Sequence, residues 1–462
     1  MTTESLNSLG SHETIFNKTG VSLPEVLLPA EGTDMQKWAV VACDQYTSQP
    51  GYWEEVERIV GNSPSALRLI LPEVYLENSN VDDMISNINI TMKKYLDDGL
   101  LVPHNPCFIY LDRETPRVKS RKGLILAVDL EKYDYTQGSR ALIRSTEKTV
   151  PERLPPRIKI RRNAPIEVPH VQLLVDDPEM AIFGHLENAV QQMDKIYDFD
   201  LMMNGGHIKG YKIERPSIIR QIAEVLEKLT DPELFADKYD VDPEDTGILL
   251  FAVGDGNHSL ASAKAHWENK KTQIPKEMQA HHPARYAMAE VVNVHDEGLI
   301  FEPIHRVLFN ANPETLIKEM DKHFSTVSPF HVKSFPSKEL MEQEKHELAA
   351  KFQGSHIFPF VTNHGYGIII IEKPRYNLDV ATLQDFLDSF LKSNPSAKID
   401  YIHGENAVTS IGEEPGNLGF YLNPIDKHGL FKTVLKDGVL PRKTFSMGEA
   451  EEKRYYLECK II

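Results

Sequence analysis

Residues 247–265 constrain the fold more than any other part of the sequence. An apolar run of strand length, residues 248–253, leads into Gly-Asp-Gly-Asn-His-Ser at residues 254–259 and then into an alanine-rich segment of helical character. The pattern predicts a buried strand, a tight turn and a helix that starts at the turn. Such a strand end suits an anion, most plausibly a phosphate, because the first amides of the helix have no intrahelical partner.

The residues of this turn are open to two interpretations. The glycines allow positive φ angles and a close approach of the backbone to a ligand, and Asp255 could hold a metal, a hydroxyl or the turn itself. His258 could donate to a phosphate or act as an acid–base group near neutral pH. In the alternative interpretation the turn is only structural, and Asn257 or Ser259 caps the helix.

Composition narrows the classes of function. The chain has 462 residues, enough for two to four domain-sized units, and its net charge of −17 argues against a protein that binds nucleic acid non-specifically. Its three cysteines lie far apart in the sequence, in no metal-binding spacing, which favours a reducing cytoplasm. The sequence predicts neither a signal peptide nor a membrane span. We therefore expect a cytoplasmic protein without nucleic-acid or membrane partners.

A second apolar run, residues 38–43, is predicted to form a short strand that ends in polar and aromatic residues. Three side chains that follow it could face a ligand: Asp44, Tyr46 and Thr47. The alternative is that Tyr52 and Trp53 begin a helix that reaches residue 60 and packs in the core.

Residues 142–162 concentrate basic side chains around one carboxylate, Glu147. A basic patch of this kind can clamp phosphates, and nearby positive charge would favour the ionised form of Glu147 as a general base. Arg144 could stabilise charge that develops on a phosphate. The alternative is a solvated loop stiffened by prolines. Farther along, His305 and Arg306 could also present cationic groups to an anion.

Periodicity predicts helices and strands along the whole chain. Helices are expected at residues 81–98, 184–197, 216–229, 313–323, 337–353 and 379–392. Strands are expected at residues 107–111, 123–128, 168–176, 287–294, 367–371 and 398–403. We expect an α/β to α+β fold in three regions: an N-terminal α/β region (1–130), a core with the phosphate site (131–310) and a C-terminal α+β region (311–462).

Several landmarks, in this order, resemble the family catalogued as domain of unknown function 1015. They are the strand end at Asp44, Glu147-Lys148-Thr149, the 254–259 motif, Pro303-Ile304-His305-Arg306 and Pro441-Arg442-Lys443-Thr444. The central motif of that family is commonly Asp-Gly-His-His-Arg, which this sequence matches at Asp255, Gly256 and His258 and departs from at Asn257 and Ser259. The His-Glu-x-Thr motif of the family is matched at Glu147 and Thr149, with Thr146 in place of histidine.

The Asp-Gly-x-His element is in turn similar to the signature of the ParB/sulfiredoxin-like nucleotide-binding fold, which includes partition CTPases, sulfiredoxin and kinases that phosphorylate free serine. The resemblance implies a mixed-sheet core that binds nucleotide phosphates. It implies a kinase that uses ATP or another nucleotide donor, with Mg²⁺, to phosphorylate a small hydroxyl-bearing metabolite, and free L-serine is the leading acceptor.

In this interpretation Glu147 and His258 are the catalytic residues. The phosphate and nucleotide would be bound by Asp255, Gly256, Asn257, Ser259, His305, Arg306, Arg144 and Thr149. The acceptor would be bound by Asp44, Tyr46 and Thr47. The sequence does not identify the residues that would hold the metal. It does not identify the oligomeric state either.

Three alternatives remain. A ParB-like nucleotide hydrolase or switch would require a basic helix-turn-helix surface, for which the sequence has no signal. Sulfiredoxin-like chemistry would require a reactive cysteine, and Cys43 at a strand end is the candidate. A non-catalytic nucleotide sensor would fit the departures at Asn257 and Ser259.

Overall fold

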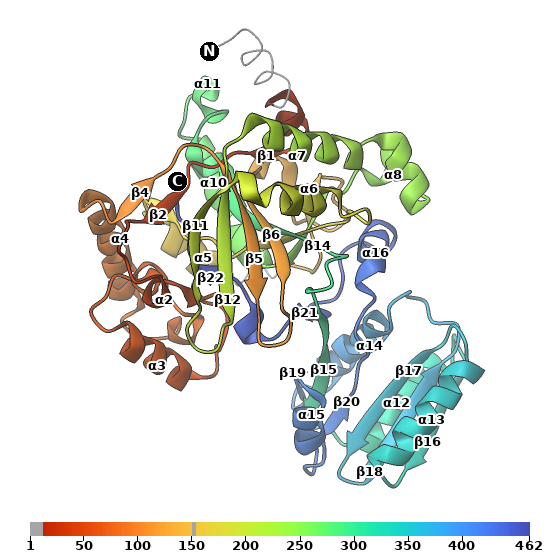
Figure 1. The fold of residues 1–462 in the computed structure, drawn as a ribbon. Coiled ribbons are helices and arrows are strands. Elements are labelled where there is room, and N and C mark those ends of the chain that lie inside the picture. Colours follow the sequence, from red (N-terminus) through yellow and green to blue (C-terminus); the bar gives the residue numbers. More distant parts are fainter. Residues whose placement is uncertain (1–12, 150–153) are drawn as a thin grey trace. The chain divides into compact units, whose positions relative to one another are not determined.

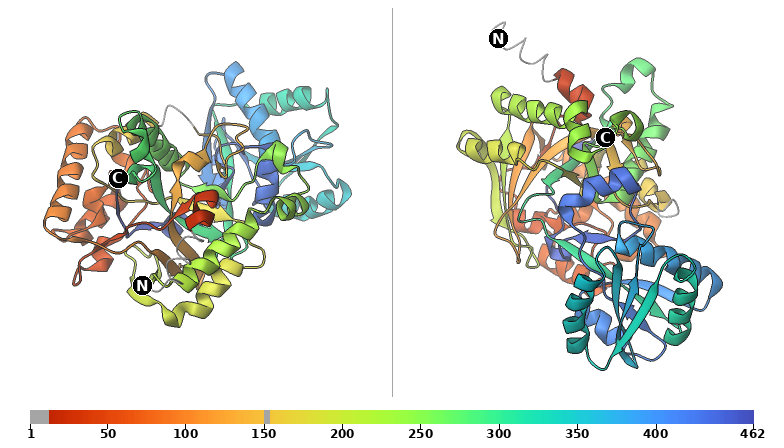
Figure 2. Two further views of the ribbon diagram at one scale, coloured as in Figure 1. Left: turned by 90° about the horizontal axis from the view of Figure 1, so that it is seen from above. Right: turned by 90° about the vertical axis from the view of Figure 1, so that its right-hand side faces the viewer.

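The structure, a computed structural model, describes residues 13–149 and 154–462. They fall into two compact units (Figure 1). The first unit contains the described residues up to Ile300 together with Met447–Ile462, and the second unit is Phe301–Ser446. The chain therefore leaves the first unit once and returns to it, so that the C-terminus lies among elements of the first unit (Figure 2).

The first unit is built on a mixed sheet with ten strands in the described residues. Their order along the main path is β11 (Asp194–Asp200), β12 (His207–Ile213), β5 (Phe108–Glu114), β6 (Arg121–Asp129), β14 (Tyr286–Asn293), β10 (Gln172–Val175), β13 (Phe251–Asp255), β8 (Ile143–Ser145) and β7 (Tyr133–Asp134), and β1 (Val21–Ser22) also pairs with β6. Three adjacent pairs are parallel: β10 with β14, β13 with β8, and β7 with β8.

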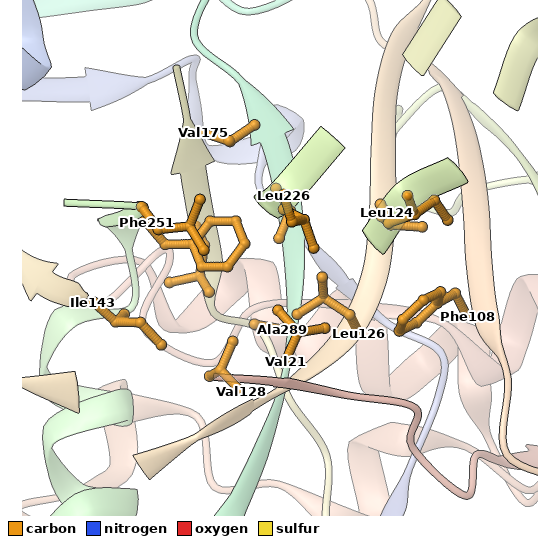
Figure 3. Close-up of a cluster of buried hydrophobic side chains, with 14 of the residues drawn as sticks. Val21, Phe108, Leu124, Leu126, Val128, Ile143, Val175, Leu226, Phe251 and Ala289 are labelled. Carbon is orange, nitrogen blue, oxygen red and sulfur yellow. The ribbon is translucent and has the colours of Figure 1, made fainter. Parts of the chain in front are cut away.

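Hydrophobic cores lie on both faces of this sheet, because successive side chains of a strand point to opposite sides. On β6, Leu124 and Leu126 belong to one core and Ile125 to the other. Figure 3 shows the first core, in which Leu126 and Phe251 lie among side chains from several strands and from α7 (Pro216–Leu229). The second core contains side chains from α3 (Pro50–Val60), from α4 (Val81–Asp97) and from the C-terminal segment, Met447–Ile462.

The strand, turn and helix expected at residues 247–265 are confirmed. Strand β13 ends at Asp255, and helix α10 runs over Asn257–Lys271. Buried residues of α10, among them Leu260 and Trp267, pack in the first core and fix the position of the helix on the sheet. The helices expected at 81–98 and 216–229 are likewise present as α4 and α7.

Three local expectations were wrong. The strand expected at 168–176 is shortened to β10 (Gln172–Val175), because Pro169 has no amide to donate to a neighbouring strand. The helix expected at 184–197 ends early: α6 covers Ala181–Ala189, and strand β11 begins at Asp194. Tyr197 of β11 packs over Gly210 of β12, where an added Cβ would lie 2.2 Å from the ring, so tertiary pairing overrides the local helical pattern. The strand expected at 38–43 is shortened to β3 (Val40–Val41), because Trp38 ends the helical turn α2 (Met35–Trp38).

The second unit contains an antiparallel sheet with helices on both faces. Six strands run in the order β16 (Phe330–Phe335), β18 (Gly365–Ile371), β17 (His356–Thr362), β20 (Leu418–Phe420), β15 (Phe301–Phe309) and β19 (Lys398–His403). Helices α12 (Pro313–Phe324) and α14 (Asp379–Ser393) pack on one face, and α13 (Lys338–Lys351) and α15 (Glu405–Gly412) supply buried side chains to the other.

The fold is therefore mixed α/β, with a large mixed sheet in the first unit. The division into 1–130, 131–310 and 311–462 stays a prediction about domains. Strands from the first two of these regions are neighbours in one sheet, since β6 pairs with β14, and residues 447–462 belong to the first unit. No helix among the described residues is both long and apolar enough to cross a membrane.

Candidate active site

The candidate site lies where the parallel strands β8 and β13 end. Ser145 is opposite Val253 in their register, so the residues that follow both strands meet at the same edge of the sheet. The hydroxyl of Thr146 donates to the carbonyl oxygen of Val253 over 2.7 Å and ties the two strand ends together. This register brings Glu147 to the edge at which Asp255 ends β13 and α10 begins.

The turn at this edge leaves the start of α10 without a side-chain cap. Gly256 is the N-cap residue, with φ +80°, and its amide donates to Oδ1 of Asp255 over 2.9 Å. A Cβ at Gly256 would lie 3.1 Å from the Cα of Val171, so a close backbone approach and a positive φ both require glycine here. Asn257 and Ser259 lie in the first turn of the helix, and neither caps it.

Three buried polar atoms near these strand ends have no hydrogen-bond partner within the described part of the chain: Oδ1 of Asn257, Oγ1 of Thr149 and Oε1 of Gln172, which is opposite Asp255 in the register of β10 and β13. A buried polar group without a partner costs about 1–3 kcal/mol. A polar ligand that bonds to such atoms would offset this cost. His258 also lies in the first turn and is partly exposed.

His170 connects this turn with Asp44, which follows the short strand β3. A Cβ on Gly256 would lie 3.6 Å from Cδ2 of His170. Nε2 of the same imidazole lies 3.8 Å from Oδ2 of Asp44, and its Nδ1 lies 2.8 Å from the hydroxyl of Tyr456. The two polar strand ends singled out in the sequence therefore lie on either side of one histidine, which the sequence analysis did not identify.

Lys453 is a second residue that the sequence analysis missed. Its Nζ lies 3.2 Å from Oδ2 of Asp255, and its side chain is only 8% exposed. The residue lies in the C-terminal segment, after the Pro441-Arg442-Lys443-Thr444 landmark, and belongs to none of the motifs. Only contact with Asp255 in the folded chain identifies it.

Part of the basic stretch at residues 142–162 also lies near Asp44. Helix α5 (Leu154–Arg162) packs against α10, and Arg157 of α5 forms an ion pair with Glu73. Burial and, secondarily, the negative charge of Asp44 raise the pKa of the Glu73 carboxyl. The Asp44 side of the site thus combines two carboxylates with one guanidinium.

Cys43 precedes Asp44, and burial raises the pKa of its thiol, with smaller contributions from the charges of Asp44 and Glu73. A thiol with a raised pKa is a poor nucleophile at neutral pH because the reactive species is the thiolate. This environment disfavours sulfiredoxin-like chemistry at Cys43.

Arg144 does not reach this edge. Its guanidinium donates to the carbonyl oxygens of Ala141, Thr246 and Ile248, which lie before the start of β13, whereas the candidate site lies at the end of that strand. Burial lowers the pKa of Arg144 to about 10. The arginine therefore holds the loop that enters β13.

The sequence allowed the residues after Asp44 either to face a ligand or to pack in the core. Trp53 is buried in α3, as the core-packing alternative expected. Tyr46 has φ +52° and stacks on Tyr52 with ring centroids 3.6 Å apart, while Thr47 is exposed. A role for Tyr46 and Thr47 in acceptor binding stays a prediction.

His305 and Arg306 belong to the second unit, on β15. Arg306 is fully buried: its Nε donates to Oε1 of Gln384 over 3.1 Å, and its guanidinium lies 4.8 Å from the centre of the Tyr401 ring. Nδ1 of His305 accepts the amide of Leu422 over 3.0 Å. A phosphate-binding role for either residue stays a prediction.

A resident metal site is not evident: no group of three or more His, Cys, Asp or Glu side chains in residues 13–149 and 154–462 is arranged to hold a metal ion. Mg²⁺ that accompanies a nucleotide needs only one or two protein carboxylates, because phosphates and waters supply the other ligands. Asp255 provides one carboxylate at the turn. The residues present therefore fit Mg²⁺ that arrives with a nucleotide.

Comparisons with known proteins give one sequence family and several distant structures. The model of the family described as "Protein of unknown function (DUF1015)" matches residues 27–390. No curated protein matches the sequence.

Three solved structures illustrate the distant similarities. A free serine kinase in complex with AMP is 10% identical, with a TM-score of 0.37 over 73% of this chain and 91% of that chain. A conserved hypothetical protein from Pyrococcus furiosus is 11% identical, with a TM-score of 0.34 over 72% and 90% of the two chains. SbnI from Staphylococcus aureus, with a C-terminal truncation, is 8% identical, with a TM-score of 0.34 over 70% and 81%. TM-scores this low do not establish a common fold.

Proposed function

The chain belongs to the DUF1015 family of proteins of unknown function, and from this premise we propose that it is a nucleotide-dependent kinase of a small hydroxyl-bearing molecule, with free L-serine as the leading acceptor. The observation that carries the proposal is the register of β8 and β13, which brings Glu147 to the strand end where Asp255 and the start of α10 lie. A carboxylate at the same sheet edge as an uncapped helix N-terminus would combine a proton acceptor with a phosphate-binding group. The first unit would then be a ParB/sulfiredoxin-like nucleotide-binding core.

The donor phosphates would lie at the N-terminus of α10. Its first amides and the positive end of the helix dipole favour negative charge, and Gly256 lets the backbone approach a phosphate closely. His258, Asn257, Ser259 and Thr149 would supply further hydrogen bonds. Mg²⁺ bound with the nucleotide would neutralise phosphate charge, and Asp255 is the carboxylate that would contact it.

The acceptor hydroxyl would lie between Glu147 and the terminal phosphate. The hydroxyl oxygen forms a bond to the terminal phosphorus, the bond from that phosphorus to the bridging oxygen of the nucleotide breaks, and the hydroxyl proton passes to Glu147. The partly exposed carboxylate of Asp44 suits the ammonium group of a free amino acid. This pairing favours serine over an acceptor without a positive charge.

The experiment is a turnover assay with Mg²⁺, a set of donors (ATP, ADP, CTP and pyrophosphate) and a panel of hydroxyl-bearing metabolites that includes L-serine. Products are identified by mass spectrometry, and we expect O-phosphoserine. Because general-base catalysis contributes roughly 10²- to 10⁴-fold, Glu147→Gln should lower kcat by about that factor and leave nucleotide Kd nearly unchanged. Glu277→Gln, at an exposed position on α11 (Lys276–Gln279), is the matched control and should behave as the wild type.

The outcomes separate the parts of the proposal. Full turnover by the Glu147→Gln variant would remove the base assignment. Nucleotide hydrolysis without any phosphorylated metabolite would favour a ParB-like hydrolase. Nucleotide binding without hydrolysis or transfer would favour the non-catalytic sensor, which the departures from the family motif at Asn257 and Ser259 support.

A further inference from the structure

The C-terminal segment, Met447–Ile462, crosses the candidate active site and is fixed there by two buried arginines. Arg113 of β5 and Arg121 of β6 are cross-strand partners, and each is 2% exposed. Arg113 donates to the carbonyl oxygens of Glu451 and Lys453 over 2.8 and 2.5 Å, and Arg121 donates to that of Glu452 over 2.9 Å. Three consecutive carbonyl groups are thereby held against the sheet.

The residue after Lys453 is held equally firmly. Arg454 is almost fully buried, and its guanidinium contacts Glu290 of β14 at 3.1 Å and Glu458 at 2.5 Å. Its Nε also donates to the carbonyl oxygen of Pro169, immediately before His170. The backbone is therefore fixed both before and after the side chain of Lys453. This fixes the direction in which that side chain leaves the backbone.

That side chain reaches the turn at the start of α10. Its ammonium lies 3.2 Å from Asp255 and is largely removed from water. Burial of an ammonium group is costly, and the ion pair with Asp255 offsets part of that cost. The position is also next to a helix N-terminus, which repels cations and attracts anions. An ammonium group at this position adds to the positive electrostatic potential that the first amides of α10 create at the helix N-terminus.

We propose that Lys453 is a phosphate-binding residue of the site, whose ammonium exchanges the carboxylate of Asp255 for a phosphoryl oxygen when a nucleotide binds. The inference rests on the proposed function and extends it to a residue outside the matched family region, which ends at residue 390. The arginines Arg113, Arg121 and Arg454 act as positioning residues, because they contact the backbone and side chains around Lys453. The ion pair with Asp255 stabilises the lysine until the phosphate is present.

Variants at Lys453 test this inference by calorimetric titration with ADP, pyrophosphate and adenosine in the presence of Mg²⁺. A lost charge-assisted contact to phosphate should weaken the binding of ADP and pyrophosphate by roughly 10- to 100-fold in Lys453→Met. Adenosine has no phosphate, so its affinity should stay within about 2-fold. Lys453→Arg should restore part of the affinity, because a guanidinium also binds phosphate.

The matched control is Lys460→Met. Lys460 is another buried lysine of the C-terminal segment. Its Nζ donates to the carbonyl oxygen of Pro283 and lies 3.7 Å from Oε1 of the buried Glu167, so this variant also removes a buried ion pair, but not the one at Asp255. This control should leave the affinity ratio of ADP to adenosine unchanged. A decrease in ADP and adenosine affinity by the same factor in Lys453→Met would show a purely structural role and overturn the inference.

A measurement on the unaltered protein guards against variants that do not fold. Lysine acylation followed by mass spectrometry should show several-fold protection of Lys453 by pyrophosphate, with no change at Lys264, which pairs with Glu268 on the surface of α10. Unchanged acylation of Lys453 in a protein that binds pyrophosphate would overturn the inference and leave the kinase proposal intact. A wild-type protein that binds neither ADP nor pyrophosphate would overturn both.

Discussion

His305 gives the second unit a pH-dependent stability. Burial, with a smaller contribution from the charge of Arg306, lowers the pKa of this histidine from 6.5 to about 4, against the opposing effect of Glu405. Nδ1 can accept the Leu422 amide only while it is unprotonated. Between these pKa values the unfolded chain binds more protons than the folded chain, so stability falls as pH decreases from 6.5 toward 4.

We expect the free energy of unfolding of the second unit to decrease by about 2 kcal/mol between about pH 7 and about pH 5 because of His305. His305→Asn keeps an acceptor for the Leu422 amide but does not titrate in this range, so its unfolding free energy should vary less with pH. Urea unfolding of both proteins across the range measures the difference. Parallel pH curves for the two proteins would contradict the prediction.

Single residues of the candidate site differ in how far the sequence could identify them. Asp255, Gly256 and His258 are recognisable because they follow a buried strand and start a helix. His170 and Lys453 belong to no local pattern. They are candidates for the site only because His170 lies next to Gly256 and Lys453 contacts Asp255. Both contacts join residues that are far apart in the sequence.

At the scale of elements, the junction between β13 and α10 depends on Gly256. An alanine there would carry the strain of φ +80° and place its Cβ 3.1 Å from the backbone of Val171. We expect Gly256→Ala to lower the free energy of unfolding of the first unit by about 1–2 kcal/mol. Displacement of the first turn of α10 should also weaken nucleotide binding. Thermal unfolding and nucleotide titration measure the two effects.

Gly184 provides the control for this substitution. It lies inside helix α6, without positive φ and with nothing within 4 Å of an added Cβ. Gly184→Ala should be neutral or stabilising by up to about 1 kcal/mol, since alanine favours helix. If the two variants had the same stability, the strain assigned to the Gly256 turn would be refuted.

Elements with strong periodicity could be predicted, and those formed by pairing could not. Helices α4 and α7 have apolar residues at helical spacing and lie close to their expected bounds. Strand β11 has no comparable local signal, and it exists because it pairs with β12 and packs Tyr197 over Gly210. The register of β8 against β13 is also a property of two strands together.

At the scale of the whole molecule, the first unit depends on the C-terminal segment. Strand β22 (Tyr455–Tyr456) of this segment pairs with β3, and Arg454 is the ion-pair partner of the buried Glu290. Removal of one partner from a buried ion pair is strongly destabilising, typically by about 3–5 kcal/mol. We expect a chain that ends at Ser446 to lose the stable structure of the first unit and to keep that of the second.

Hydrogen exchange measured by mass spectrometry can follow the two units separately. In the shortened chain, amides of β6 and β14 should exchange much faster than in the full chain, while those of β17 and β18 should keep their protection. A chain that ends at Lys460 keeps Arg454 and β22 and should resemble the wild type. Unchanged protection of β6 and β14 in the shorter chain would refute the dependence.

The sequence by itself determined the local features of this protein: the strand, turn and helix around residues 247–265 and the amphipathic helices. These features follow from residue spacing and backbone preferences within short windows. Only the tertiary structure decided that Glu147 is placed at the edge where β13 ends, that His170 lies between Asp44 and the turn, and that Lys453 reaches Asp255. Strand register and long-range packing bring these residues together, and both depend on the free energy of the whole folded unit.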